Sequence, residues 1–213
     1  MFAAHLGLSL RANYSEPIMT QTGDPLPFRN CDGCTLCCKV MRVDVLNKPG
    51  GKWCQHCKIG EGCGIHEMRP DECRAFYCGY LTYPVFDERW KPSVAHLLAR
   101  MDSGSGWVGI HVDPQRPDAW RREPYYSGIK EMAKKAQKSQ LVVMVFIGKR
   151  VWAVYPDKDV DLGEAKKGYK TIRRQLLTPN GPRYEVRFEP PSYVPMKQEN
   201  ASSGSANYFA MEP

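Results

Sequence analysis

Apolar residues in the second half of the chain recur with a period of two or in short runs, and both patterns predict strands. Residues 106–114 (GWVGIHVDP) alternate and end at a proline, which predicts one strand. Residues 141–157 (LVVMVFIGKRVWAVYPD) contain two apolar runs separated by Gly148 and Lys149, which predicts a β-hairpin with a type II′ turn. The pattern of 93–101 (SVAHLLARM) fits either a strand or a short helix.

Two segments have helical features instead. Residues 125–138 place one apolar face at a spacing of three and four, which predicts a helix. That face consists of Tyr126, Ile129, Met132 and Ala133. Residues 163–177 (GEAKKGYKTIRRQLL) predict a basic helix weakened by Gly168, and 178–191 predict a turn with a last edge strand. The expected fold class is therefore α+β, with a small antiparallel sheet and one or two helices.

The cysteines divide the chain, because all nine lie in a short segment of its first half. We expect a flexible leader over 1–27 and a cysteine-cluster metal-binding domain over 28–88. We further expect an α+β extension packed on it over 89–190, and a disordered tail over 191–213. The first domain should be loop-rich and held by metal.

Charge and hydropathy limit the cellular locations and the classes of partner that fit this protein. No apolar run approaches the roughly 20 residues that span a bilayer, and the opening stretch lacks the features of a signal peptide. We therefore expect a cytoplasmic protein, without membrane association, whose thiols stay reduced. The formal charge is +7, but eight thiolates around two divalent ions would lower it to about +3. Nucleic acid is thus only weakly supported as a partner.

The spacing of the cysteines is typical of thiolate metal sites. They form C-x2-C-x2-C-C, then C-x2-C-x5-C, then C-x4-C. A C-x2-C turn lets two sulfurs converge on one ion, and two such turns about 16 residues apart resemble a four-thiolate zinc site. The predicted metal ligands are Cys31, Cys34, Cys37, Cys38, Cys54, Cys57, Cys63, Cys73 and Cys78.

Cys37 and Cys38 are adjacent, so we expect their side chains to diverge. Both on one tetrahedral ion would strain the chain between them. They fit better if each faces a different centre, or if one of them bridges. Nine thiols suffice for two four-thiolate centres and one spare, or for one polynuclear centre.

The nature of the metal stays open at this point. Thiolates suit both zinc and iron–sulfur clusters, so the expected cofactor is zinc or iron, the latter as an iron–sulfur cluster. His56 or His66 could replace a thiolate on zinc, although a position beside the ligands or at the protein surface is favoured. A disulfide framework is disfavoured by the odd cysteine count, and nine unrelated buried cysteines are disfavoured by their spacing.

Residues 70–76 (PDECRAF) predict a short helix that carries one of the cysteines. Pro70 suits its first position, and Cys73 would lie near its N-terminus, where thiolate is favoured. Arg69 and Arg74 flank that cysteine. We expect these two arginines to offset the charge of the bound centre from beside the ligands, the alternative being two solvated side chains.

Together these blocks resemble a known family. CDGCTLCC, WCQHC and GCGIHEMRPDECRAFYC are similar to the CxxCxxCC zinc- or iron-chelating domain, found in the YkgJ-like cysteine-cluster proteins. The resemblance covers about residues 28–80, and His66 stands where the family has tyrosine more often. It implies metal binding by the cysteines, and it implies little about what the metal does.

Three functions are compatible with these features. The first is a cytoplasmic metal or iron–sulfur protein in redox, sensing or metal handling. The second is an interaction module in which zinc is purely structural, with an acidic protein or nucleic acid as partner. The third, a metalloenzyme, is the least supported, because no catalytic spacing of carboxylates and no nucleotide or nucleophile motif is found. No catalytic residue is predicted.

Overall fold

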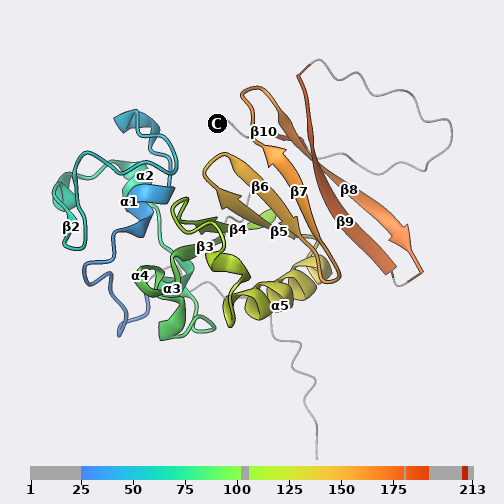
Figure 1. The fold of residues 1–213 in the computed structure, drawn as a ribbon, viewed down its shortest axis with the longest axis horizontal. Coiled ribbons are helices and arrows are strands. Elements are labelled where there is room, and N and C mark those ends of the chain that lie inside the picture. The colour runs from blue at the N-terminus through green and yellow to red at the C-terminus, as the bar shows by residue number, and fades with distance from the viewer. Residues whose placement is uncertain (1–24, 102–105, 180, 192–207, 211–213) are drawn as a thin grey trace, which may run out of the picture.

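The computed structural model describes residues 25–101, 106–179 and 181–191, together with the backbone of 208–210. Helices and several sheets make up a mixed fold, so the α+β class predicted from the sequence is confirmed (Figure 1). The predicted leader lies outside the described residues except for 25–27. Within the described part of the chain, no helix has the length and apolar character needed to cross a membrane.

A five-stranded sheet forms the centre of the second half. Its strand order is β3-β4-β5-β6-β7. The strands are β3 Leu97–Met101, β4 Trp107–Val112, β5 Val142–Ile147, β6 Arg150–Val154 and β7 Asp159–Glu164. The sheet is larger than expected and is mixed, because β4 and β5 run parallel while the other neighbours are antiparallel. Helix α5, Tyr125–Lys138, connects the parallel pair, as such a connection requires a crossover.

Several predicted elements are confirmed in this half. The predicted helix 125–138 is α5, and the alternating segment 106–114 contains β4. β5 and β6 form the predicted hairpin, in which Gly148 has a φ of +59° and Lys149 is not left-handed, as in a type II′ turn. The ambiguous segment 93–101 contains both alternatives, the end of helix α4 (Pro92–Ala95) followed by β3.

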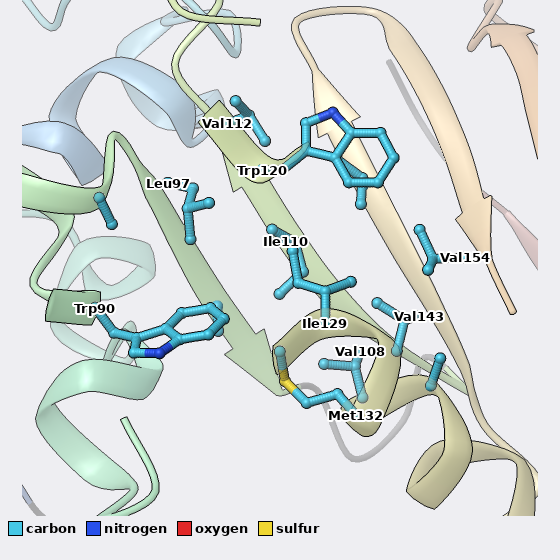
Figure 2. Packing of buried hydrophobic residues seen from close by; sticks show 14 of the residues in the cluster. Trp90, Leu97, Val108, Ile110, Val112, Trp120, Ile129, Met132, Val143 and Val154 are labelled. Atoms are coloured by element: carbon cyan, nitrogen blue, oxygen red, sulfur yellow. The ribbon is translucent and has the colours of Figure 1, made fainter. Parts of the chain in front are cut away.

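One face of this sheet packs against α5 and forms the main core (Figure 2). Val108, Ile110 and Val112 of β4 point to this side, and Ile129 of α5 meets them with no exposed surface. Trp120, from the 3-10 helix η4 (Ala119–Arg121), closes the core beside β6. Large apolar side chains from both the sheet and α5 therefore give the second half of the chain a hydrophobic core of its own.

Gly128 on α5 lies directly against Trp90, and its substitution gives a first testable prediction. A Cβ at Gly128 would lie 2.6 Å from the Trp90 ring, which cannot shift easily because Phe86 and Tyr125 pack on it. Gly128→Ala should therefore destabilise the protein by about 1–2 kcal/mol, although alanine favours a helix by about 1 kcal/mol. Urea unfolding checks this, with the exposed Ser127→Ala as the control. An unchanged or higher stability of Gly128→Ala would contradict it.

A second, three-stranded sheet covers part of the opposite face. β8 (Lys170–Thr178) and β9 (Gly181–Glu189) form a long antiparallel hairpin, and β10 (Tyr208–Ala210) pairs with β8. Tyr184 and Val186 of β9 pack on the apolar side chains of β5 and β6. β10 lies within the segment that we expected to be a disordered tail, so that expectation is wrong for these three residues.

The predicted basic helix over 163–177 is wrong. These residues form the end of β7, a turn and most of β8. Gly163 and Gly168 both have left-handed backbone angles, with φ of +77° and +81°, which a helix cannot accommodate. Thr171 and Ile172 are buried within β8, and the basic residues that misled the prediction flank them in the sequence.

Residues 28–88, hereafter the cysteine lobe, consist of short elements and turns at one end of the sheet (Figure 1). The α-helices are α1 Leu36–Val40, α2 Asp71–Arg74 and α3 Gly79–Thr82, and the strands are β1 Cys57–Lys58 and β2 Gly62–Cys63. The 3-10 helices are η1 Asp44–Leu46 and η2 His66–Met68, and η3 Glu88–Trp90 follows. The lobe packs against the sheet through a small apolar cluster, in which Leu98 of β3 contacts Leu36, Val40 and Leu81.

Candidate metal centre

Local turns bring the thiols of each C-x2-C pair together. The backbone N–H of Cys34 donates to the carbonyl of Cys31 at 2.7 Å, and Cys57 donates to Cys54 in the same way at 3.0 Å. Such a turn of four residues places its first and last side chains near each other. Both predicted pairs therefore have the local geometry of a thiolate site.

A glycine allows the first turn to approach the rest of the lobe. Gly33 has a φ of +70°, and a Cβ there would lie 2.4 Å from the carbonyl oxygen of Gly60. Gly60 belongs to the turn between β1 and β2. That hairpin in turn places Cys57 directly opposite Cys63, so their side chains share one face.

The electrostatic interactions between the thiols define two groups. The first thiol group is Cys31, Cys34 and Cys78. The second thiol group is Cys37, Cys38, Cys54, Cys57, Cys63 and Cys73. All nine thiols are free, and only Cys31 is exposed. The structure thus brings every predicted ligand into one of two neighbouring sets.

Cys38 connects the two groups. Its thiol is hydrogen-bonded to those of Cys37 and Cys57, and it also interacts with Cys31 of the first group. The expected divergence of Cys37 and Cys38 stays a prediction, since Cys37 also packs on the apolar cluster that contains Cys78 of the first group. The alternative in which one of the adjacent cysteines bridges two sets agrees with this arrangement.

Burial and crowding keep several of these thiols protonated in the absence of metal. Burial raises the pKa of Cys57 and of Cys78 to about 11 each, and nearby thiols add to both rises. The hydrogen bond from Cys37 is the main cause that raises the pKa of Cys38. The pKa of Cys73 is also raised, by burial and then by Cys38, so the expected helix-terminus effect does not prevail in α2, which has only four residues.

Three cations lie near the thiols: Arg69 and Lys91 near the first thiol group, and Lys48 near the second. Burial raises the pKa of Cys31, whereas Arg69 lies close enough to oppose that rise. The Nε atom of Arg69 is buried and has no hydrogen-bond partner within the described residues. Lys48, which the sequence analysis did not single out, is buried beside the second thiol group. No sequence signal marks Lys48, since it lies in a polar loop between two apolar segments.

The other predicted residues near the site have different surroundings. Arg74 donates to the backbone carbonyls of Arg69 and Glu67, so it braces the loop before α2. His66 is exposed and lies 2.8 Å from the guanidinium of Arg69. Whether Arg69 and Arg74 influence a bound centre stays a prediction.

The donor set fits a thiophilic metal, although its present arrangement is not a coordination sphere. Across 25–101, 106–179 and 181–191, no group of three or more His, Cys, Asp or Glu side chains is arranged to hold a metal ion. A metal would have to replace the hydrogen bonds among the thiols. Soft thiolates suit zinc or iron–sulfur clusters, and the unpartnered Nε of Arg69 suits an anionic centre. We therefore consider the site compatible with either group.

Comparisons with family models, with curated proteins and with solved structures find no match for this chain. The resemblance to the cysteine-cluster family consequently stays a prediction that rests on the motifs.

Proposed function

We propose that the cysteine lobe is a thiolate metal-binding domain that holds zinc or an iron–sulfur cluster, as the resemblance to the YkgJ-like family implies. The observation that carries this proposal is the gathering of nine free thiols into two groups connected by Cys38. Free thiols at this density suit a reducing compartment, which supports a cytoplasmic location. The role that we favour is redox, sensing or metal handling.

The residues around the thiols would perform three tasks in such a domain. The C-x2-C turns present the ligands, and the β1–β2 hairpin holds Cys57 beside Cys63. Thr35 fixes this hairpin, because its hydroxyl accepts a hydrogen bond from Gly60 and interacts with the thiol of Cys57. Arg69 and Lys48 offset negative charge. A bound metal would supply either cross-links between distant segments or, as an iron–sulfur cluster, electron transfer.

A purely structural zinc is the second candidate, and the small core of the lobe favours it. The lobe buries few apolar side chains apart from those packed on β3. Zinc would then stabilise a surface for an acidic protein or nucleic acid. The basic residues of 163–177, which could contribute to that surface, lie in the turn after β7 and on β8.

Metal and sulfide analysis separates these candidates. Protein purified without oxygen is assayed for zinc, iron and acid-labile sulfide, and its visible spectrum is recorded. Iron with sulfide near stoichiometry would support the redox or sensing role. About two zinc ions per chain without colour would support the structural role. Protein that contains neither metal, and takes up neither on reconstitution, would refute both.

The position of Cys38 predicts how single substitutions change metal content. Cys38→Ser should lower the metal content of both thiol groups, because its thiol interacts electrostatically with members of each. Cys78→Ser should affect the first group alone, and so remove about half as much metal. Metal analysis of the two purified variants, with circular dichroism to verify folding, checks this. Equal losses in the two variants would contradict a bridging position of Cys38.

A further inference from the structure

Lys48 is a buried lysine held in a fixed position next to the second thiol group. It is 6% exposed, and its Nζ donates to the backbone carbonyls of Lys39, at 2.9 Å, and Met41. Burial lowers the pKa of Lys48, and interactions with four cysteines oppose that lowering: Cys54, Cys38, Cys37 and Cys73. The two carbonyls therefore hold the ammonium group of Lys48 at the end of α1, the helix that carries Cys37 and Cys38.

Lys39 provides a comparison within the same lobe. Its Nζ is also buried, but it donates to the carboxylate of Asp113, at 2.5 Å, and to the amide oxygen of Gln115, at 2.8 Å. A buried charge is costly unless a charge of the opposite sign compensates it. Asp113 compensates Lys39, whereas the interactions that favour the charged form of Lys48 come from the four cysteines.

We propose that Lys48 is the internal counter-cation of the second thiol group and favours its metal-bound form over its metal-free form. This rests on the proposed function. When one divalent ion binds four thiols, four S–H bonds break, four protons leave to solvent, and four metal–sulfur bonds form. The local charge falls from zero to −2, because two positive charges arrive and four leave. A fixed cation nearby stabilises the product of this exchange and not its starting state.

Substitutions of Lys48 test the role of its charge. Lys48→Gln retains a donor for the carbonyls and loses the charge, whereas Lys48→Arg retains the charge. Lys52→Gln removes one charge from an exposed position of the same lobe and is the matched control. Zn²⁺ affinity is measured by chelator competition at constant pH and salt, and Co²⁺ absorption reports the ligand set. We expect Lys48→Gln to bind Zn²⁺ at least about tenfold more weakly, with the control and Lys48→Arg near wild type.

Each result has a defined consequence. An unchanged Co²⁺ spectrum with the weaker Zn²⁺ binding of Lys48→Gln would support an electrostatic role. Equal affinity of Lys48→Gln and wild type would overturn the counter-cation proposal alone. An altered Co²⁺ spectrum in Lys48→Gln, or equal weakening in Lys48→Arg, would also overturn it, since either indicates that the side chain only maintains the loop. If wild-type protein binds neither Zn²⁺ nor Co²⁺, the proposed function itself fails.

Discussion

A chelator that removes the metal is expected to unfold the cysteine lobe and to leave the five-stranded sheet folded. The two parts differ in what stabilises them. The sheet and α5 enclose a large apolar core, whereas the lobe relies on a small cluster around Leu36, Val40 and Leu98. Structural zinc contributes about 10–16 kcal/mol of binding free energy in small domains, which exceeds what so small a cluster supplies. The metal should therefore decide whether the lobe folds.

Amide hydrogen exchange measures this by region. Amides of α1 and of the β1–β2 hairpin should lose protection after chelation, while those of α5 and β5 keep it. Adding back the metal should restore the protection, and a chelator already saturated with zinc is the control. Unchanged protection of α1, with an unchanged melting temperature, would refute the role of metal as the scaffold of the lobe.

Asp113→Asn is expected to destabilise the protein by about 3–5 kcal/mol, because it leaves the charge of Lys39 buried without its partner. Asp113 follows β4, and Lys39 belongs to α1, so the ion pair joins the sheet to the cysteine lobe. The side chains of this pair are only 4% and 11% exposed. The ring of Trp53 lies 5.2 Å from the Lys39 ammonium and further shields it from water.

A double-mutant cycle with Lys39→Met isolates the interaction between the two charges. Lys39→Met together with Asp113→Asn should be less destabilising than the sum of the single changes. The control is Glu131→Ala, which breaks the exposed ion pair with Lys134 on α5 and should cost less than about 0.5 kcal/mol. If Asp113→Asn costs no more than Glu131→Ala in urea unfolding, the buried pair has no such role.

Local sequence patterns predicted the secondary structure correctly where a single physical constraint determined the conformation of the segment. The helical spacing around Ile129 predicted α5, and the Gly148–Lys149 pair predicted the turn between β5 and β6, where Gly148 is left-handed. The same approach failed over 163–177, where the basic composition favoured a helix but two left-handed glycines and the burial of Ile172 impose strands. Parallel pairing of β4 and β5 was also missed, since no local pattern encodes which strands become neighbours.

The sequence by itself determined the α+β class, the nine candidate ligands and their C-x2-C turns, because spacing along the chain sets these features. Only the tertiary structure divided the thiols into two groups, with Cys38 close enough to interact electrostatically with both. Only the tertiary structure placed Lys48 beside them, since Lys48 approaches Cys54 and Cys73 through the packing of separate turns. Distances between residues far apart in the chain depend on how the elements pack, and local patterns do not carry that information.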